Sequence, residues 1–87
     1  MFMEKIIVEI KCPALSDIFE FRISKKLAVN EGIRKIITEM RGYAQNEKLF
    51  SDISEVRLYS GRLKCVLNGS LTFSENNVHS GDTLMII

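Results

Sequence analysis

Apolar and polar residues alternate in two segments near the start of the chain, and this period of two is typical of strands with one buried face. We therefore predict strands over residues 4–11 and 18–24. The proline-containing turn between them joins the two strands into an antiparallel hairpin. The side chains expected to point into the core are those of Ile6, Val8, Ile10, Phe19, Phe21 and Ile23.

A helical period follows, with apolar residues at positions i, i+3, i+4 and i+7 that form one stripe. Asn30 is a suitable N-cap, because its side-chain oxygen can accept hydrogen bonds from the first backbone N–H groups, and Val29 before it could act as a hydrophobic staple. Gly42 is suited to a left-handed stop. We predict a helix of about three turns between these signals. Its apolar stripe is Ile33, Ile36, Ile37 and Met40.

The second half of the chain predicts three shorter strands. Residues 43–54 are mostly polar and form a connection with room for a short helical turn. Two glycine-containing turns, Ser60-Gly61 and Asn68-Gly69, bound the middle strand. The predicted strands cover residues 55–59, 63–67 and 83–87.

The order of these elements favours one topology. If the last strand buries Leu84 and Ile86 beneath the helix, the simplest arrangement places it beside the first strand, in the middle of a mixed sheet. The expected fold is α+β, a β-grasp with a mixed sheet of four to five strands packed on one helix. We expect a single domain over residues 1–87, because no repeat or linker divides the sequence.

Composition and charge exclude several classes of function. Twelve Lys and Arg residues against eleven Asp and Glu give a net charge of +1, with the two signs interspersed. Nucleic-acid binders usually carry a basic stripe that neutralises phosphates, so we expect no nucleic-acid partner. The apolar run in residues 1–10 is too short and too charged for a signal peptide or a spanning helix. We expect a cytoplasmic protein without direct membrane insertion.

Few residues suit catalysis or metal binding. Cys12 and Cys65 match no metal-ligand spacing and are expected to be reduced, mostly buried thiols, with a disulfide or a redox role as the alternative. His79 is the one histidine of the sequence and is expected in an exposed turn. We therefore predict that the protein is not an enzyme and has no cofactor, metal site or catalytic residue.

Four apolar residues are expected on the face of the sheet that the helix leaves open: Ile7, Tyr59, Met85 and Ile87. If the first and last strands are neighbours, these side chains form one exposed patch. Soluble proteins seldom display such a patch without a binding use, so we predict that it binds a protein partner. The alternatives are that a second copy of the chain covers it in a homodimer, or that Phe2 and the neighbouring N-terminal residues do.

The segment from Leu71 to Ile87 resembles the ubiquitin-like signature, in which an apolar residue and a short polar turn precede an apolar anchor and a tight turn into the last strand. Val78 corresponds to the anchor and Gly81-Asp82 to the tight turn. This segment, the length and the strand–strand–helix opening resemble the bacterial YukD/EsaB-like ubiquitin-like proteins associated with type VII secretion. The resemblance implies a non-enzymatic cytoplasmic accessory protein that binds a secretion-system component.

The alternative is a ubiquitin-like modifier or sulfur carrier. Proteins of that kind end in an exposed Gly-Gly tail, because the terminal carboxylate must enter narrow active sites. The sequence ends with Leu84-Met85-Ile86-Ile87, so this alternative requires a tail that the sequence does not contain.

Overall fold

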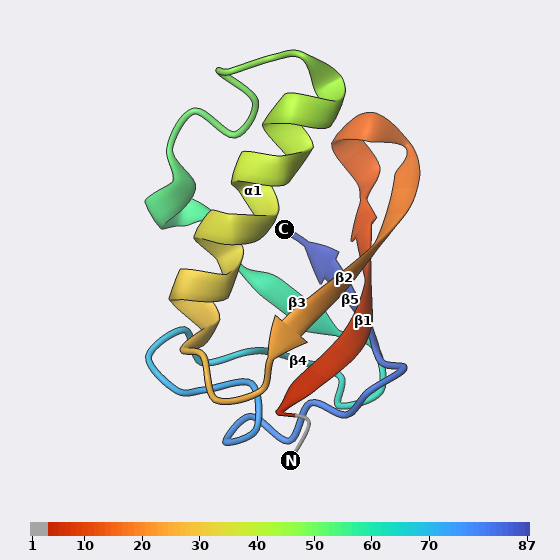
Figure 1. Ribbon diagram of the computed structural model, residues 1–87, viewed down its shortest axis with the longest axis vertical. Helices are drawn as coiled ribbons and strands as arrows, with labels where there is room; N and C mark the ends of the chain where they lie inside the picture. The colour runs from red at the N-terminus through yellow and green to blue at the C-terminus, as the bar shows by residue number, and fades with distance from the viewer. Residues whose placement is uncertain (1–3) are drawn as a thin grey trace.

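One long helix crosses one face of a mixed sheet in the computed structural model, which describes residues 4–87 (Figure 1). Within those residues the sheet has five strands. The elements in chain order are β1 (Lys5–Cys12), the 3-10 turn η1 (Pro13–Leu15), β2 (Asp17–Ser24), α1 (Val29–Ala44), the 3-10 turn η2 (Ile53–Glu55), β3 (Leu58–Ser60), β4 (Cys65–Val66) and β5 (Thr83–Ile86).

The strand order in the sheet is β2-β1-β5-β3-β4. β1 pairs with β2 in antiparallel fashion and with β5 in parallel fashion, so that Ile10 lies between Phe19 and Leu84. β3 pairs antiparallel with both β5 and β4. The last strand therefore lies beside the first in the middle of the sheet. This confirms the predicted α+β fold, a ubiquitin-like β-grasp with one helix on a mixed sheet.

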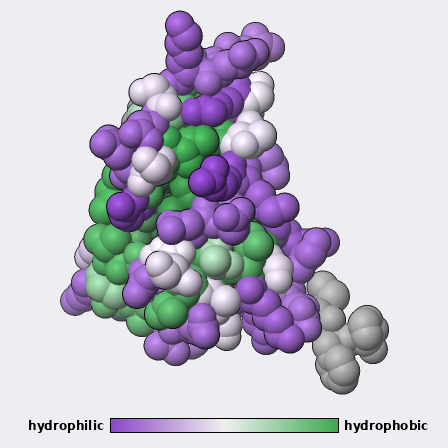
Figure 2. All heavy atoms as spheres, turned by 90° about the vertical axis from the view of Figure 1, so that its left-hand side faces the viewer, coloured by the Kyte–Doolittle hydropathy of each residue, from purple (hydrophilic) through white to green (hydrophobic). Residues whose placement is uncertain are grey.

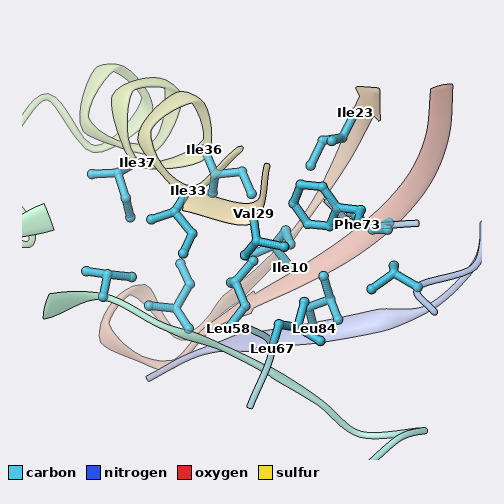
Figure 3. Close-up of a cluster of buried hydrophobic side chains, with 14 of the residues drawn as sticks. Ile10, Ile23, Val29, Ile33, Ile36, Ile37, Leu58, Leu67, Phe73 and Leu84 are labelled. Atoms are coloured by element: carbon cyan, nitrogen blue, oxygen red, sulfur yellow. The ribbon is translucent and has the colours of Figure 1, made fainter. Parts of the chain in front are cut away.

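The core lies between α1 and the sheet face that it covers (Figure 3). The predicted helical stripe and the inward positions of β1 and β5 are buried, and Phe73 from the loop before β5 fills the space beside the start of α1. Burying each such side chain stabilises the fold by about 1.5–3 kcal/mol. The fully buried residues with the largest side chains are Phe73, Ile10, Ile36, Ile37, Met40, Leu58 and Leu84.

The start of α1 differs from the prediction. The N-cap is Ala28, without a side-chain hydrogen bond, and Val29 is a buried residue of the first turn. The backbone N–H of Val29 donates to the carbonyl of Leu71 at 2.9 Å, and that of Asn30 donates to the carbonyl of Gly69 at 3.0 Å. The predicted Asn30 cap is wrong, because the loop before β5 supplies carbonyls to these exposed donors.

The end of α1 is also later than predicted. Gly42 lies inside the helix, which continues to Ala44 and ends where Gln45 takes a left-handed conformation with φ of 53°. The guanidinium of Arg41 donates to the carbonyls of Leu49 and Phe50, each at 2.8 Å. These bonds hold the following connection against the last turn of the helix. Figure 2 shows the side of the molecule that carries this connection, and hydrophobic residues are visible there between hydrophilic ones.

The two strands after the helix are shorter than predicted. Residues 53–55 form η2, capped by the Asp52 side chain, which accepts from the N–H of Ser54 at 3.1 Å. β3 therefore begins only at Leu58, and β4 contains two residues where the prediction had five. The expected short helical turn is present as η2, at the end of the connection.

Candidate functional site

The outer face of the sheet, opposite α1, has Met85 at its centre. Side chains alternate between the two faces of a strand, so Met85 points outward when Leu84 and Ile86 are buried in the core. Met85 pairs with Lys11 on β1 and with Tyr59 on β3. Both neighbours therefore flank it on this outer face.

The same register continues to both edges of the sheet. Ile18 on β2 lies opposite Lys11 and is 52% exposed, and Val66 on β4 lies opposite Tyr59 and is 47% exposed. One line of side chains therefore crosses all five described strands. We call it the outer-face row, and its members in spatial order are Ile18, Lys11, Met85, Tyr59 and Val66.

The predicted site residues are only partly brought together. Tyr59 and Met85 are direct neighbours, and Ile87 lies two residues beyond Met85, with its backbone paired to Arg57 at 3.0 and 3.1 Å. Ile7 is exposed on the same face but does not join them. Glu9 and its partner on β5 separate Ile7 from Met85. The expected single patch of four residues is therefore wrong for Ile7.

Lys11 and two apolar members of the row were not among the predicted site residues. Ile18 is out of phase with Phe19, and Val66 is out of phase with Leu67, which is buried. That alternation was the available signal. Ile18 was the first residue of the predicted strand over residues 18–24, and no face was assigned to the residues of the predicted strand over residues 63–67.

A shallow hollow of about 340 Å³ lies beside the row, between Met85 and the turn that joins β1 to β2. Charged side chains of both signs on β1 and β2 share the outer face with it, which is typical of the rim of a binding surface. The residues that line the hollow are Lys11, Cys12, Pro13, Ser16, Asp17, Ile18 and Met85.

The position of β5 is held by Asp82, which is buried although it carries a carboxylate. Arg62 donates to it through Nε and Nη2, each at 2.9 Å, and the N–H of His79 donates to it at 2.9 Å. The Arg62 hydrogen bond is the main reason that the pKa of Asp82 lies below its ordinary value. The same bond raises the pKa of Arg62. The pair is structural, since it orients the residues just before Met85.

The cysteines differ in environment. Cys12 is buried at the end of β1, and Cys65 on β4 is exposed, so the expectation of two mostly buried thiols is wrong for Cys65. β4 is an edge strand of two residues, both exposed, which explains the difference. Both cysteines are free thiols. His79 is exposed, as predicted.

Across residues 4–87, no group of three or more His, Cys, Asp or Glu side chains is arranged to hold a metal ion. In the same part of the chain, no helix has both the length and the apolar character that a membrane crossing requires. Phe2, which was considered as a cover for the outer face, lies outside the described residues.

Comparison with solved structures identifies the architecture. The chain superposes on the N-terminal ubiquitin-like domain of the 4931431F19Rik protein with a TM-score of 0.71 and 17% identity, over 99% of this chain and 76% of that one. This chain has a ubiquitin-like fold. The ubiquitin-like domain of Arabidopsis thaliana At2g32350 gives a TM-score of 0.73 and 19% identity, covering 98% of this chain and 78% of that one.

A protein designed on the basis of ubiquitin is also similar, with a TM-score of 0.70 and 13% identity over 99% of this chain and 90% of that one. No protein-family model and no curated protein matches the sequence. At these identities the likeness concerns the fold alone. A function must therefore be argued from the surface of this chain.

Proposed function

We propose that this ubiquitin-like protein is a non-enzymatic binding module that docks a partner protein on the outer-face row. The observation that carries the proposal is the register that aligns Ile18, Met85, Tyr59 and Val66 across the whole sheet. Apart from Lys11 the row is apolar, and an exposed apolar patch often marks a protein-binding site.

The shape of the row favours an amphipathic helix as the docking element. From Ile18 on β2 to Val66 on β4 the row spans four interstrand spacings, about 19 Å in total. A helix of about 13 residues has that length. Its apolar side chains would contact Met85 and Tyr59, while acidic residues beside them would face Lys11.

The proposed setting is the cytoplasm, as an accessory component of a type VII secretion system. The support is the resemblance of the segment from Leu71 to Ile87, and of the element order, to the YukD/EsaB-like proteins. The general ubiquitin-like signature expects an apolar anchor and a tight turn here, and Val78 is buried while Gly81 has a φ of 93° just before β5. The expected partner is a component of that secretion system, and we choose the cytoplasmic part of its ATPase as the candidate for the test.

The test is the affinity of the purified chain for that ATPase domain, measured by calorimetry. We expect Met85→Glu to weaken binding by at least about tenfold, because a charge at the centre of an apolar interface must be desolvated. Thr38→Glu, on the exposed side of α1, is the matched control and should bind like the wild type. Circular dichroism of both variants checks that the fold is intact.

Two results would contradict the proposal at different levels. Wild-type protein that does not bind the ATPase domain removes the assignment to the secretion system. Binding that survives Met85→Glu, with the fold intact, removes the outer-face row as the docking surface.

A further inference from the structure

Residues 4–87 contain two methionines, and these lie in opposite environments. Met40 on α1 is 1% exposed and belongs to the core. Met85 on β5 is partly exposed and faces outward between the buried residues Leu84 and Ile86. An oxidant must reach the sulfur of a methionine to convert it into a sulfoxide. The two methionines should therefore differ strongly in their rates of oxidation.

The hollow beside the outer-face row gives a small oxidant access to Met85. It has a volume of about 340 Å³, and Met85 is one of the residues that line it. Hydrogen peroxide has one more oxygen atom than water, and a water molecule in the liquid takes up about 30 Å³. The hollow is therefore large enough to admit peroxide and its water shell beside Met85.

Met85 is also the member of the row at which a change of polarity has the largest effect. It is the central residue of the five, and it pairs with Lys11 on one side and with Tyr59 on the other. Oxidation converts the flexible apolar thioether into a polar sulfoxide, a change that disrupts interfaces built on methionine. A partner that covers the row must then strip water from the sulfoxide oxygen, and this desolvation opposes binding.

We propose that Met85 is a redox modification site that switches docking on the outer-face row. Hydrogen peroxide oxidises Met85 and releases the partner, and a thiol-dependent methionine sulfoxide reductase restores the thioether and with it the binding surface. This inference rests on the function proposed for the row, because it adds a form of regulation to that same surface.

The forward step transfers one oxygen atom to the sulfur. A lone pair on Sδ of Met85 attacks one oxygen of hydrogen peroxide, the O–O bond breaks and an S–O bond forms. The other oxygen leaves with both protons as water, so that the sulfur loses two electrons and the peroxide gains two. In the return step two thiols of the reductase system become a disulfide, and the sulfoxide oxygen leaves as water.

Cys65 is an exposed thiol that peroxide also oxidises, so its reaction must be separated from that of Met85. Cys65 pairs with Ser60, which is buried, and it precedes Val66 in β4. Its side chain therefore points to the sheet face opposite the one that carries the row. The experiment uses Cys65→Ser protein throughout, so that peroxide cannot join two chains through this thiol.

The experiment treats the folded protein with hydrogen peroxide and follows each methionine by peptide mass spectrometry. We expect Met85 to gain an oxygen atom at least about tenfold faster than Met40, which the core protects. After removal of the peroxide, the affinity for the ATPase domain in calorimetry should be at least about tenfold lower. Reductases for both sulfoxide epimers, supplied with dithiothreitol, should restore it. Circular dichroism checks that the oxidised protein is folded.

Met85→Leu is the decisive variant, because leucine is apolar and similar in volume but has no sulfur to oxidise. Its affinity should lie within about threefold of that of the unmodified protein and should not change after peroxide treatment. Met40→Leu is the matched control, because it removes the buried methionine and leaves the exposed one. It should lose affinity after peroxide treatment as the parent protein does.

Three outcomes would overturn this inference and leave the docking function standing. The first is equal oxidation rates for Met85 and Met40 in the folded protein. The second is unchanged affinity after complete oxidation of Met85. The third is a loss of affinity that also occurs in Met85→Leu protein, or that accompanies unfolding. If the unoxidised protein does not bind the ATPase domain, the proposed function fails first and the inference fails with it.

Discussion

The carboxylate of Asp82 accepts two hydrogen bonds from the guanidinium of Arg62, with both N–O distances 2.9 Å. Arg62 follows β3, and Asp82 immediately precedes β5. The carbonyl of Asp82 also accepts from the N–H of Glu9 on β1 at 2.9 Å. One residue thus connects three of the strands that carry the outer-face row.

This pair predicts a loss of stability in acid. The pKa of Asp82 is lowered in the folded state, mainly by Arg62, relative to a value of about 3.9 in an unfolded chain. Between those two values the unfolded state binds more protons, so stability is fully present above about pH 4 and falls as the pH drops through the folded pKa. Urea unfolding of Asp82→Asn should show a loss on the order of 1 kcal/mol at pH 7 and a weaker acid dependence than wild type.

Glu47→Gln is the control for that measurement, because Glu47 is an exposed carboxylate on the connection after α1. It should keep the acid dependence of the wild type. An Asp82→Asn protein with the same stability at pH 7 and the same acid slope as the wild type would show that the Arg62 contact contributes nothing.

Two glycines of α1 predict opposite effects of alanine. A Cβ at Gly32 would lie 2.5 and 2.7 Å from two ring atoms of Phe73, which is fully buried. We expect Gly32→Ala to destabilise the protein by about 1–3 kcal/mol, because the ring must move. Thermal or urea unfolding measures the change.

Gly42 provides the matched comparison. It lies inside the same helix and is exposed, and apart from its chain neighbours and the adjacent helix backbone no atom lies within 4 Å of a Cβ built there. Gly42→Ala should stabilise the protein by about 0.5–1 kcal/mol through reduced backbone entropy in the unfolded state. Destabilisation by Gly42→Ala would contradict the placement of this residue within the helix.

The outer-face row predicts unequal effects for two exposed isoleucines. Ile18 belongs to the row, and Ile7 is separated from it by Glu9. Ile18→Glu should weaken binding of the ATPase domain by at least about tenfold, and Ile7→Glu by less than about threefold. Equal losses for both variants would mean that the binding surface extends along β1 instead of across the strands.

The different burial of the two cysteines predicts that one thiol reacts quickly with a disulfide reagent and the other slowly. Cys65 is exposed, whereas Cys12 is 1% exposed in the core. In native protein, a chromogenic disulfide reagent should modify one thiol per chain quickly and the second only after denaturant is added. Cys65→Ser should remove the fast reaction. Two fast thiols in the native protein would contradict the burial of Cys12.

The positions that followed a strict period were predictable from sequence. Ile6, Val8 and Ile10 alternate so clearly that one face of β1 buries all three. Leu84 and Ile86 alternate in the same way, and the simplest topology that buries them beneath the helix places β5 beside β1. The ends of α1 were not predictable in this way. Asn30 has a good N-cap side chain, but the carbonyls of Gly69 and Leu71, far along the chain, satisfy the first N–H groups instead.

The candidate site shows the same division. Met85 and Tyr59 were identified from their phase within their own strands, which is local information. Which outward side chains are neighbours depends on the register between strands. Ile7 was predicted to contact Met85, but the β1–β5 register sets Met85 opposite Lys11. No local pattern reports that register.

The central claim is that a partner protein contacts the outer-face row. The most direct measurement is an NMR titration of the labelled chain with the secretion ATPase domain, followed at the amides of Ile18, Lys11, Met85, Tyr59 and Val66. The account predicts that the largest shifts or broadenings fall on this row, with the exposed side of α1 unaffected. Perturbations confined to α1, with the row unchanged at saturation, would contradict it.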